Sequence, residues 1–113
     1  MALSALTRSY ELVAAAGDDL TLSYAARHLG FADAAAGRAG VARERLEESV
    51  RLRRGLGFLP GVAAGVLALA ELAARGGNKD EAATLAEEAR SIAESCGADG
   101  VLRWVEHFRD EWL

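Results

Sequence analysis

The sequence of 113 residues is poor in cysteine, proline and aromatic residues, and its longest uncharged segment is short. These features argue against a disulfide-stabilised protein and against a membrane-spanning one. Its single cysteine, Cys96, cannot form an intrachain disulfide, so the chain suits a reducing compartment. The uncharged segment Leu59–Ala70 is shorter than the roughly 20 residues that cross a bilayer. Arg8 and Glu11 interrupt the N-terminal apolar segment, which therefore does not resemble a signal peptide. We expect a cytoplasmic protein without membrane contact.

A basic excess is also missing. The formal net charge is −4, and Lys79 is the only lysine. The densest basic cluster, Arg51, Arg53 and Arg54, is narrower than the basic surface that nucleic-acid binding normally requires. We therefore expect no direct contact with nucleic acid.

What the sequence does contain is an internal repeat of forty residues without insertions. Gly17, Gly57 and Gly97 fall in register. The other matching sets are Ala2/Ala42/Ala82, Leu6/Leu46/Ala86, Leu12/Leu52/Ile92, Leu29/Leu69 and Gly37/Gly77. A fixed period in this range is typical of stacked helical hairpins, in which each unit buries its apolar face against a neighbour.

Apolar spacing and capping residues predict six helices and no strand. The helices are expected over residues 2–16, 20–36, 40–54, 60–75, 79–95 and 100–113. Gly17 and Gly37 should end helices, Asp18 or Asp19 should cap the second, and Pro60 fits the first turn of the fourth. Asn78 followed by Glu81 resembles a capping box. The expected organisation is a single all-α domain made of a half repeat (1–17), two repeats (18–57 and 58–97) and a capping helix (99–113).

The same spacing predicts the core. In the second helix the expected apolar stripe is Leu22, Ala25, Ala26, Leu29, Ala32 and Ala36. In the fourth helix it is Val62, Val66, Leu69, Leu72 and Ala73. The fifth helix should bury Ala82, Leu85, Ala86, Ala89, Ile92, Ala93 and Cys96. Leu46 and Leu69 should be buried between paired helices.

Small and large apolar residues follow a finer pattern inside each repeat. The first repeat has Leu29-Gly30, Gly37, Ala42, Leu46 and Ser49, and the second has Leu69-Ala70, Gly77, Ala82, Ala86 and Ala89. This pattern resembles the tetratricopeptide repeat, although the units are longer than its usual 34 residues. Segments such as 45–49 and 71–76 look most like the long repeats of bacterial LuxR/MalT-type and antibiotic-pathway transcription regulators. The resemblance implies a TPR-like α–α superhelix whose first helices line a concave binding surface.

No residues converge into a catalytic, cofactor or metal site. His28 has no histidine, cysteine or carboxylate partner within a turn on its own helical face. Glu47-Glu48 and Glu87-Glu88 are adjacent pairs whose side chains point about 100° apart, so ion pairs with Arg51 and Arg90 explain them better than a metal does. We therefore expect a non-enzymatic protein without a cofactor.

Two surfaces are candidate binding sites. The first is a groove on the second and fourth helices, away from their core stripes, formed by Tyr24, Arg27, His28, Phe31, Leu67, Glu71 and Arg75. The second is the aromatic stripe of the last helix, formed by Val101, Trp104, Val105, Phe108 and Trp112. This stripe either caps the repeats or contacts another chain.

These features favour a protein–protein interaction or regulatory scaffold module of a bacterial cytoplasmic regulator, with a protein or peptide partner. Two alternatives remain open at this point. The chain could be a homodimerisation module, because two and a half repeats are near the lower limit of independent stability. It could also be a repeat domain that senses a small molecule or peptide.

Overall fold

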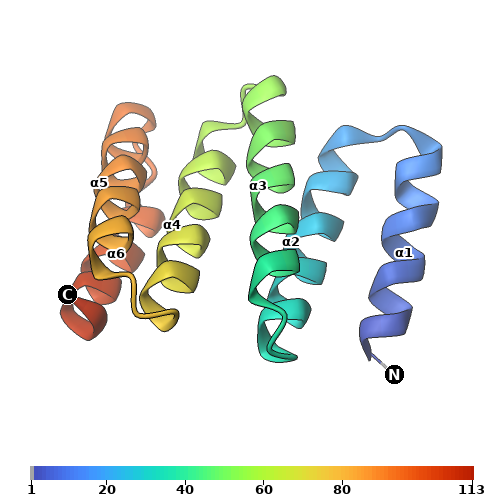
Figure 1. Cartoon of the computed structure of the whole chain (residues 1–113). Helices are drawn as coiled ribbons and strands as arrows, with labels where there is room; N and C mark the ends of the chain where they lie inside the picture. The colour runs from blue at the N-terminus through green and yellow to red at the C-terminus, as the bar shows by residue number, and fades with distance from the viewer. Residues whose placement is uncertain (1) are drawn as a thin grey trace. The chain divides into compact units, whose positions relative to one another are not determined.

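The computed structural model describes the backbone of residues 2–113 and the side chains of residues 5–113. Over that range the chain forms helices and no strand, which confirms the all-α prediction. The helices are α1 (Ala2–Ala16), α2 (Asp19–Ala35), α3 (Ala39–Gly55), α4 (Leu59–Arg75), α5 (Lys79–Cys96) and α6 (Asp99–Trp112) (Figure 1). Each boundary lies within one residue of its predicted position. The side chain of Ala2, part of the predicted half repeat, lies outside the described residues.

Glycines in the left-handed conformation set these boundaries. Every turn between consecutive helices contains one, with φ between 68° and 81°, and they recur every twenty residues. They are Gly17, Gly37, Gly57, Gly77 and Gly97. Glycine adopts this conformation without a steric penalty and so ends a helix sharply. The forty-residue repeat is therefore two helix-and-glycine units of equal length.

Side-chain caps fix two of the helix starts. The Asp18 carboxylate accepts hydrogen bonds from the Thr21 amide at 3.1 Å and the Thr21 hydroxyl at 2.8 Å. Asn78 Oδ1 accepts from the Glu81 amide at 3.3 Å, and its Nδ2 donates to Glu81 Oε2 at 2.9 Å. Pro60 lies in the first turn of α4, where its missing N–H is not needed. Of the two predicted caps for α2, the structure selects Asp18.

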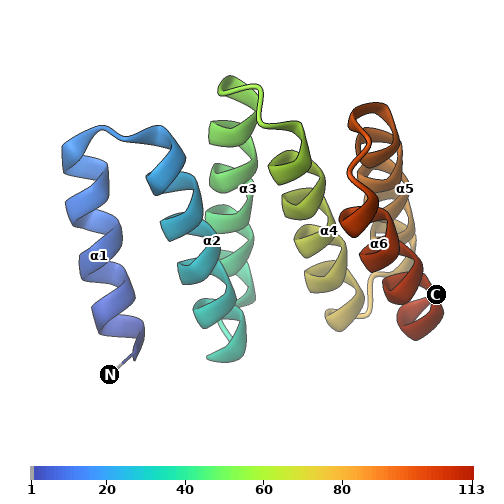
Figure 2. The ribbon, with the colours of Figure 1, turned by 180° about the vertical axis from the view of Figure 1, so that it is seen from behind.

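The chain divides into two compact units, Met1–Gly57 and Phe58–Leu113, here called the N-terminal and C-terminal units. In the N-terminal unit α2 packs against both α1 and α3. In the C-terminal unit α5 packs against α4, and α6 packs against both of them. Figure 2 shows α6 beside α5 in this unit. The single-domain organisation expected from the sequence stays a prediction.

The core of the N-terminal unit contains polar groups that hydrophobic spacing did not predict. Leu46 is only 2% exposed, as predicted. The buried stripe of α2 is Ser23, Ala26, Leu29, Gly30 and Asp33. The predicted stripe was wrong at Ala36, which is exposed, and it omitted Ser23, Gly30 and Asp33. Ser23 and Asp33, the polar residues of this stripe, can be buried because each has a polar partner.

Those partners come from α3 and from the turn before it. Ser49 Oγ donates to the Ser23 carbonyl at 2.7 Å, and Arg53 Nε donates to Ser23 Oγ at 3.2 Å. Asp33 pairs with Arg38 at 3.7 Å. Burial of a polar group costs little once it is hydrogen-bonded, so a stripe chosen by hydrophobicity alone misses these positions.

The core of the C-terminal unit is built mainly from alanine and valine. The α5 residues at its centre are Ala82, Ala86, Ala89 and Ala93, all essentially inaccessible, as predicted. Leu85 and Ile92, which were also predicted to be buried, are only half-buried. The predictions were less accurate for α4. Val62 and Val66 are buried, but Leu69, Leu72 and Ala73 are only half-buried, so the expected burial of Leu69 was wrong. The buried residues of α4 are mostly small ones, and Leu69 lies beside them.

Candidate functional site

One face of α2 carries the first four predicted groove residues together. Tyr24, Arg27, His28 and Phe31 have the i, i+3, i+4, i+7 spacing that places side chains along one side of a helix. Tyr24 is 44% exposed and Phe31 is 41% exposed, while His28 is exposed and Arg27 half-buried. The adjacent side of α2 faces α3 through Ser23 and Gly30. We call the four residues the α2 surface.

Guanidinium groups hold both aromatic rings of the α2 surface. The Arg27 guanidinium carbon lies 4.8 Å from the centre of the Phe31 ring. That of Arg53, which comes from α3, lies 4.5 Å from the centre of the Tyr24 ring. Such stacking contributes roughly 0.5–1 kcal/mol at exposed sites and more where water is excluded. One face of each ring is therefore stacked on a guanidinium group, and each residue keeps part of its surface exposed, 44% for Tyr24 and 41% for Phe31.

Arg53 belongs to the basic cluster noted in the sequence, but it is not a surface charge. It is 2% exposed, and burial lowers the pKa of its guanidinium. Its aliphatic part and its hydrogen bond to Ser23 place it in the core, and its planar end supports Tyr24. No local pattern in the sequence indicates this role, because the partners are about thirty residues apart.

The α4 residues of the predicted groove differ in accessibility. Leu67 is buried, so the prediction that it lies on an open face was wrong. Glu71 is half-buried and pairs with exposed Arg75 at 2.7 Å. The Arg75 guanidinium carbon also lies 5.5 Å from the centre of the Trp112 ring. Arg75, which is paired with Glu71, therefore helps to attach α6 to α4.

The aromatic stripe of α6 has two parts. Val101, Val105 and Phe108 are buried against the rest of the C-terminal unit, and Trp112 is half-buried. Trp104 is 57% exposed. Three residues of the stripe thus seal the apolar side of the unit, while Trp104 is open.

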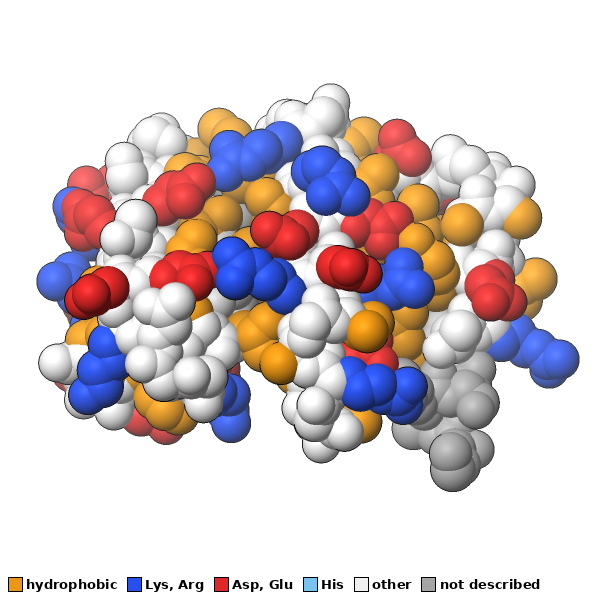
Figure 3. Space-filling view, in the orientation of Figure 1, with side chains coloured by type: hydrophobic (Ala, Val, Ile, Leu, Met, Phe, Trp, Pro, Cys, Tyr) orange, Lys and Arg blue, Asp and Glu red, His pale blue; other side chains and the backbone are white. Residues whose placement is uncertain are grey.

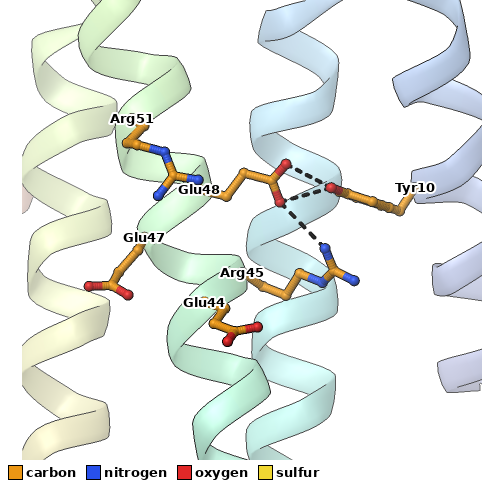
Figure 4. A pocket seen from close by; sticks show the side chains of 6 residues that line it. All are labelled: Tyr10, Glu44, Arg45, Glu47, Glu48 and Arg51. Carbon is orange, nitrogen blue, oxygen red and sulfur yellow. Dashed lines mark hydrogen bonds and ion pairs between the residues drawn. The ribbon is translucent and has the colours of Figure 1, made fainter.

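Sequence reasoning missed a polar cleft between α1 and α3. The cleft has a volume of about 370 Å³ and is lined by Tyr10, Glu44, Arg45, Glu47, Glu48 and Arg51 (Figure 4). The Tyr10 hydroxyl lies 2.7 and 2.9 Å from the two Glu48 carboxylate oxygens, so it can donate to one of them at a time. Arg45 stacks 4.5 Å from the centre of the Tyr10 ring and lies 3.6 Å from Glu48. Burial and the Glu48 carboxylate together raise the pKa of Tyr10.

Two of the acidic residues that line the cleft have basic partners on α3. Glu47 pairs with Arg43 at 3.8 Å, and Glu48 is occupied by Tyr10 and Arg45. Figure 3 shows acidic and basic side chains interspersed on the exposed side of α3. No short-range pattern in the sequence links residues 38 positions apart, which is why the Tyr10–Glu48 contact could not be predicted.

Other expected features have ordinary surroundings. Glu87 pairs with Arg90, as predicted, whereas the partner of Glu47 is Arg43 and the predicted pairing with Arg51 was wrong. Cys96, expected to be buried, is half-buried, and its thiol lies 3.7 Å from the Ala93 carbonyl. Within the described part of the chain, no group of three or more histidine, cysteine or acidic residues is placed to hold a metal ion.

No family model matches this sequence, and no curated protein matches it. None of the helices in residues 2–113 is long and apolar enough to cross a membrane. The likeness to tetratricopeptide repeats and to LuxR/MalT-type regulators stays a prediction.

Proposed function

We propose that this protein is a non-enzymatic protein–protein interaction module that binds a protein or peptide partner through the α2 surface. One observation carries the proposal: Tyr24 and Phe31 remain more than 40% exposed although each is fixed by a stacked guanidinium. An aromatic ring already held in place loses little conformational entropy on binding. Tyrosine and arginine are also enriched among the residues that dominate binding energy at interfaces.

The chemistry of the α2 surface favours a particular kind of partner. It combines two apolar rings with Arg27 and His28 and has no acidic side chain among its four residues. A complementary segment would present apolar side chains spaced about two helical turns apart and a carboxylate near Arg27. Complementary charges would favour correct encounters and disfavour basic partners.

A random peptide library displayed on phage would test this proposal. Peptides that bind the full chain should lose about 30-fold or more in affinity on Tyr24→Ala or Phe31→Ala, which matches the ~2 kcal/mol expected of an interface hot spot. Unfolding by urea should change little, because both rings are partly exposed. Trp104→Ala is the matched control, since it removes another exposed aromatic from a different helix.

Two results would contradict the proposal. In the first, enriched peptides bind both α2 variants as well as they bind the original chain. In the second, both substitutions lower the free energy of unfolding by several kcal/mol, which would make the rings part of the core. We also propose that the module belongs to a bacterial transcription regulator. This part of the proposal rests only on the resemblance of the repeats to those of such regulators.

Homodimerisation is a second candidate function, favoured by the exposure of Trp104. Trp104 is 57% exposed, whereas the other aromatic residues of the α6 stripe are buried or half-buried, and such an exposed aromatic side chain is a suitable contact for a second copy. Light scattering should then give twice the monomer mass, and Trp104→Ala should return the mass to that of one chain. A monomer at all concentrations excludes this candidate.

A further inference from the structure

The polar cleft between α1 and α3 has two lining charges that remain unpaired. Glu47 and Glu48 have basic partners on α3. Glu44 and Arg51 also line the cleft, and both are exposed. Within residues 5–113 neither of these two side chains forms an ion pair or a hydrogen bond. The cleft therefore offers one free carboxylate and one free cation to a ligand.

These two free charges lie toward opposite ends of the cleft. Figure 4 shows Arg51 above Glu48 and Glu44 below it on α3. The two free residues are seven positions apart, which is about 10 Å along a helix axis and close to two turns. Their side chains therefore leave the same face of α3.

The middle of the cleft is neutralised internally. The Tyr10 hydroxyl donates to Glu48 at 2.7 Å, and Arg45 lies 3.6 Å from the same carboxylate. The Nε–H group of Arg45 is buried and has no hydrogen-bond acceptor within residues 5–113. A buried donor without an acceptor is unfavourable, so a small rotation of Arg45 toward a ligand carbonyl would stabilise a complex. The middle of the cleft therefore suits uncharged polar groups.

The forty-residue repeat does not require the two free charges. Positions 44 and 51 of α3 correspond to Thr84 and Ser91 of α5, which are also exposed but uncharged. Even so, α5 packs against α4 as α3 packs against α2. Helix formation and packing in this register therefore do not depend on the charges of Glu44 and Arg51.

The neighbours of the free charges disfavour a ligand with only one charge. Glu47 and Glu48 lie within about one turn of Arg51, so a small anion beside Arg51 would also be repelled by carboxylates. A small cation beside Glu44 would likewise be close to the guanidinium of Arg45. A molecule with opposite charges at its two ends satisfies both positions.

From this arrangement we propose that the cleft binds a short free peptide of about three residues in an extended conformation. Its terminal carboxylate pairs with Arg51, and its terminal ammonium group pairs with Glu44. An extended chain spans about 3.3–3.6 Å per residue, so three residues match the separation of about 10 Å along α3. The volume of about 370 Å³ is near the lower end for small-molecule sites and favours small side chains. The site is separate from the α2 surface and does not depend on it.

Trialanine is a defined probe for this site, and an NMR titration of the full chain measures its binding. The dissociation constant should be about 1 mM or lower. Acetylation of its amino group or amidation of its carboxylate should each weaken binding about fivefold or more, because each removes one charge. Dialanine should also bind more weakly, because it cannot reach both ends of the cleft.

Substitutions taken from α5 test the two free charges. Glu44→Thr and Arg51→Ser should each weaken trialanine binding about fivefold or more while the free energy of unfolding stays nearly unchanged, because both side chains are exposed. Arg54→Ser is the matched control, since Arg54 is exposed on α3 but does not line the cleft. The double exchange Glu44→Arg with Arg51→Glu should bind trialanine more tightly than either single exchange, because the peptide can then bind in the opposite direction.

Three results would overturn the proposal. The first is an absence of chemical-shift changes in α1 and α3 at ten times the expected dissociation constant. The second is equal binding of trialanine and its two blocked forms. The third is a loss on Arg54→Ser as large as that on Arg51→Ser, which would indicate general attraction by surface charge. Tyr24→Ala and Phe31→Ala should leave trialanine binding unchanged, so failure here is distinguishable from failure of the α2 surface.

Discussion

The two helix pairs α2–α3 and α4–α5 have the same repeat register but different chemistry at the buried interface. The N-terminal unit joins its helices through hydrogen bonds, whereas the C-terminal unit places only methyl groups at the same positions. The exchanged residues are Ser23, Ser49 and Arg53 in one unit and Ala63, Ala89 and Ala93 in the other. The repeat thus specifies where helices meet, and the side chains at those positions determine how they are joined.

The two units also differ in how they distribute side-chain size. In the N-terminal unit Gly30 has no side chain and lies against Leu46, the large one. The C-terminal unit has alanine at both corresponding positions, 70 and 86. A leucine at the centre of the helix interface therefore requires a glycine, which has no side chain, opposite it. Protein interiors are packed so closely that changing the size of only one residue of such a pair should lower stability.

Loss of Leu46 should produce the largest change. Leu46→Ala should reduce the free energy of unfolding by about 2–5 kcal/mol, because it removes a buried side chain and leaves a cavity beside Gly30. Urea denaturation followed by circular dichroism would measure it. Ala86→Gly in the other unit is the matched change and should cost only about 1 kcal/mol, mainly through helix propensity. Equal losses at the two positions would show that the size difference is unimportant.

Breaking the polar network should come next. Ser23→Ala removes the acceptor of the Arg53 Nε–H bond and should cost about 1–3 kcal/mol. Ser49→Ala should cost less, about 1 kcal/mol, because it deletes a donor and leaves a helical carbonyl. Ala63→Ser is the reverse exchange in the C-terminal unit and should destabilise by burying a hydroxyl. If Ser23→Ala is neutral, the network adds nothing to stability.

The difference between the units also shows which structural features could be predicted from the sequence. Helix positions were predictable because glycines and caps act locally, through residues within one turn. The four buried alanines of α5 were predictable because they are apolar and periodic, whereas the larger members of the predicted stripe are only half-buried. Ser23, Asp33 and Arg53 were not, since their burial depends on partners from another helix or turn.

The candidate site shows the same division. The spacing of Tyr24, Arg27, His28 and Phe31 in the sequence predicts that they lie on one face of a helix, and in the structure they do. The support of Tyr24 by Arg53 and the contact of Tyr10 with Glu48 could not be foreseen. Both depend on contacts between residues that are far apart in the chain. Leu67 was misplaced for a related reason, because an apolar residue beside a core stripe can be covered by packing that periodicity does not reveal.

A smaller effect is expected from Gly30→Ala. The added methyl would meet Leu46 at 3.0 Å and the Ala42 carbonyl at 3.3 Å, so overpacking should outweigh the gain in helix propensity and cost about 1 kcal/mol. In a Leu46→Ala background the same change should instead stabilise, because space is available and the pair then matches Ala70 and Ala86. The coupling energy from a double-mutant cycle measures this reversal. Additive effects would mean that the two positions do not constrain each other.

The smallest expected effect separates the helix caps of the two units by pH. The Asp18 carboxylate accepts two hydrogen bonds from Thr21, and these hold its pKa below the ordinary value. Because the folded-state pKa is the lower one, the stability from this cap is fully present above the unfolded-state pKa. It is lost as pH falls through the folded-state pKa. Asp18→Asn keeps a capping side chain that does not titrate, so the variant and the original chain should unfold at similar urea concentrations at pH 7. Near pH 3 the original chain should become less stable relative to the variant.

Asn78, the cap of α5, does not titrate, so Asn78→Ala should produce a loss of stability that is nearly the same at both pH values. A constant difference between Asp18→Asn and the original chain across this range would show that the Asp18 carboxylate does not stabilise the start of α2.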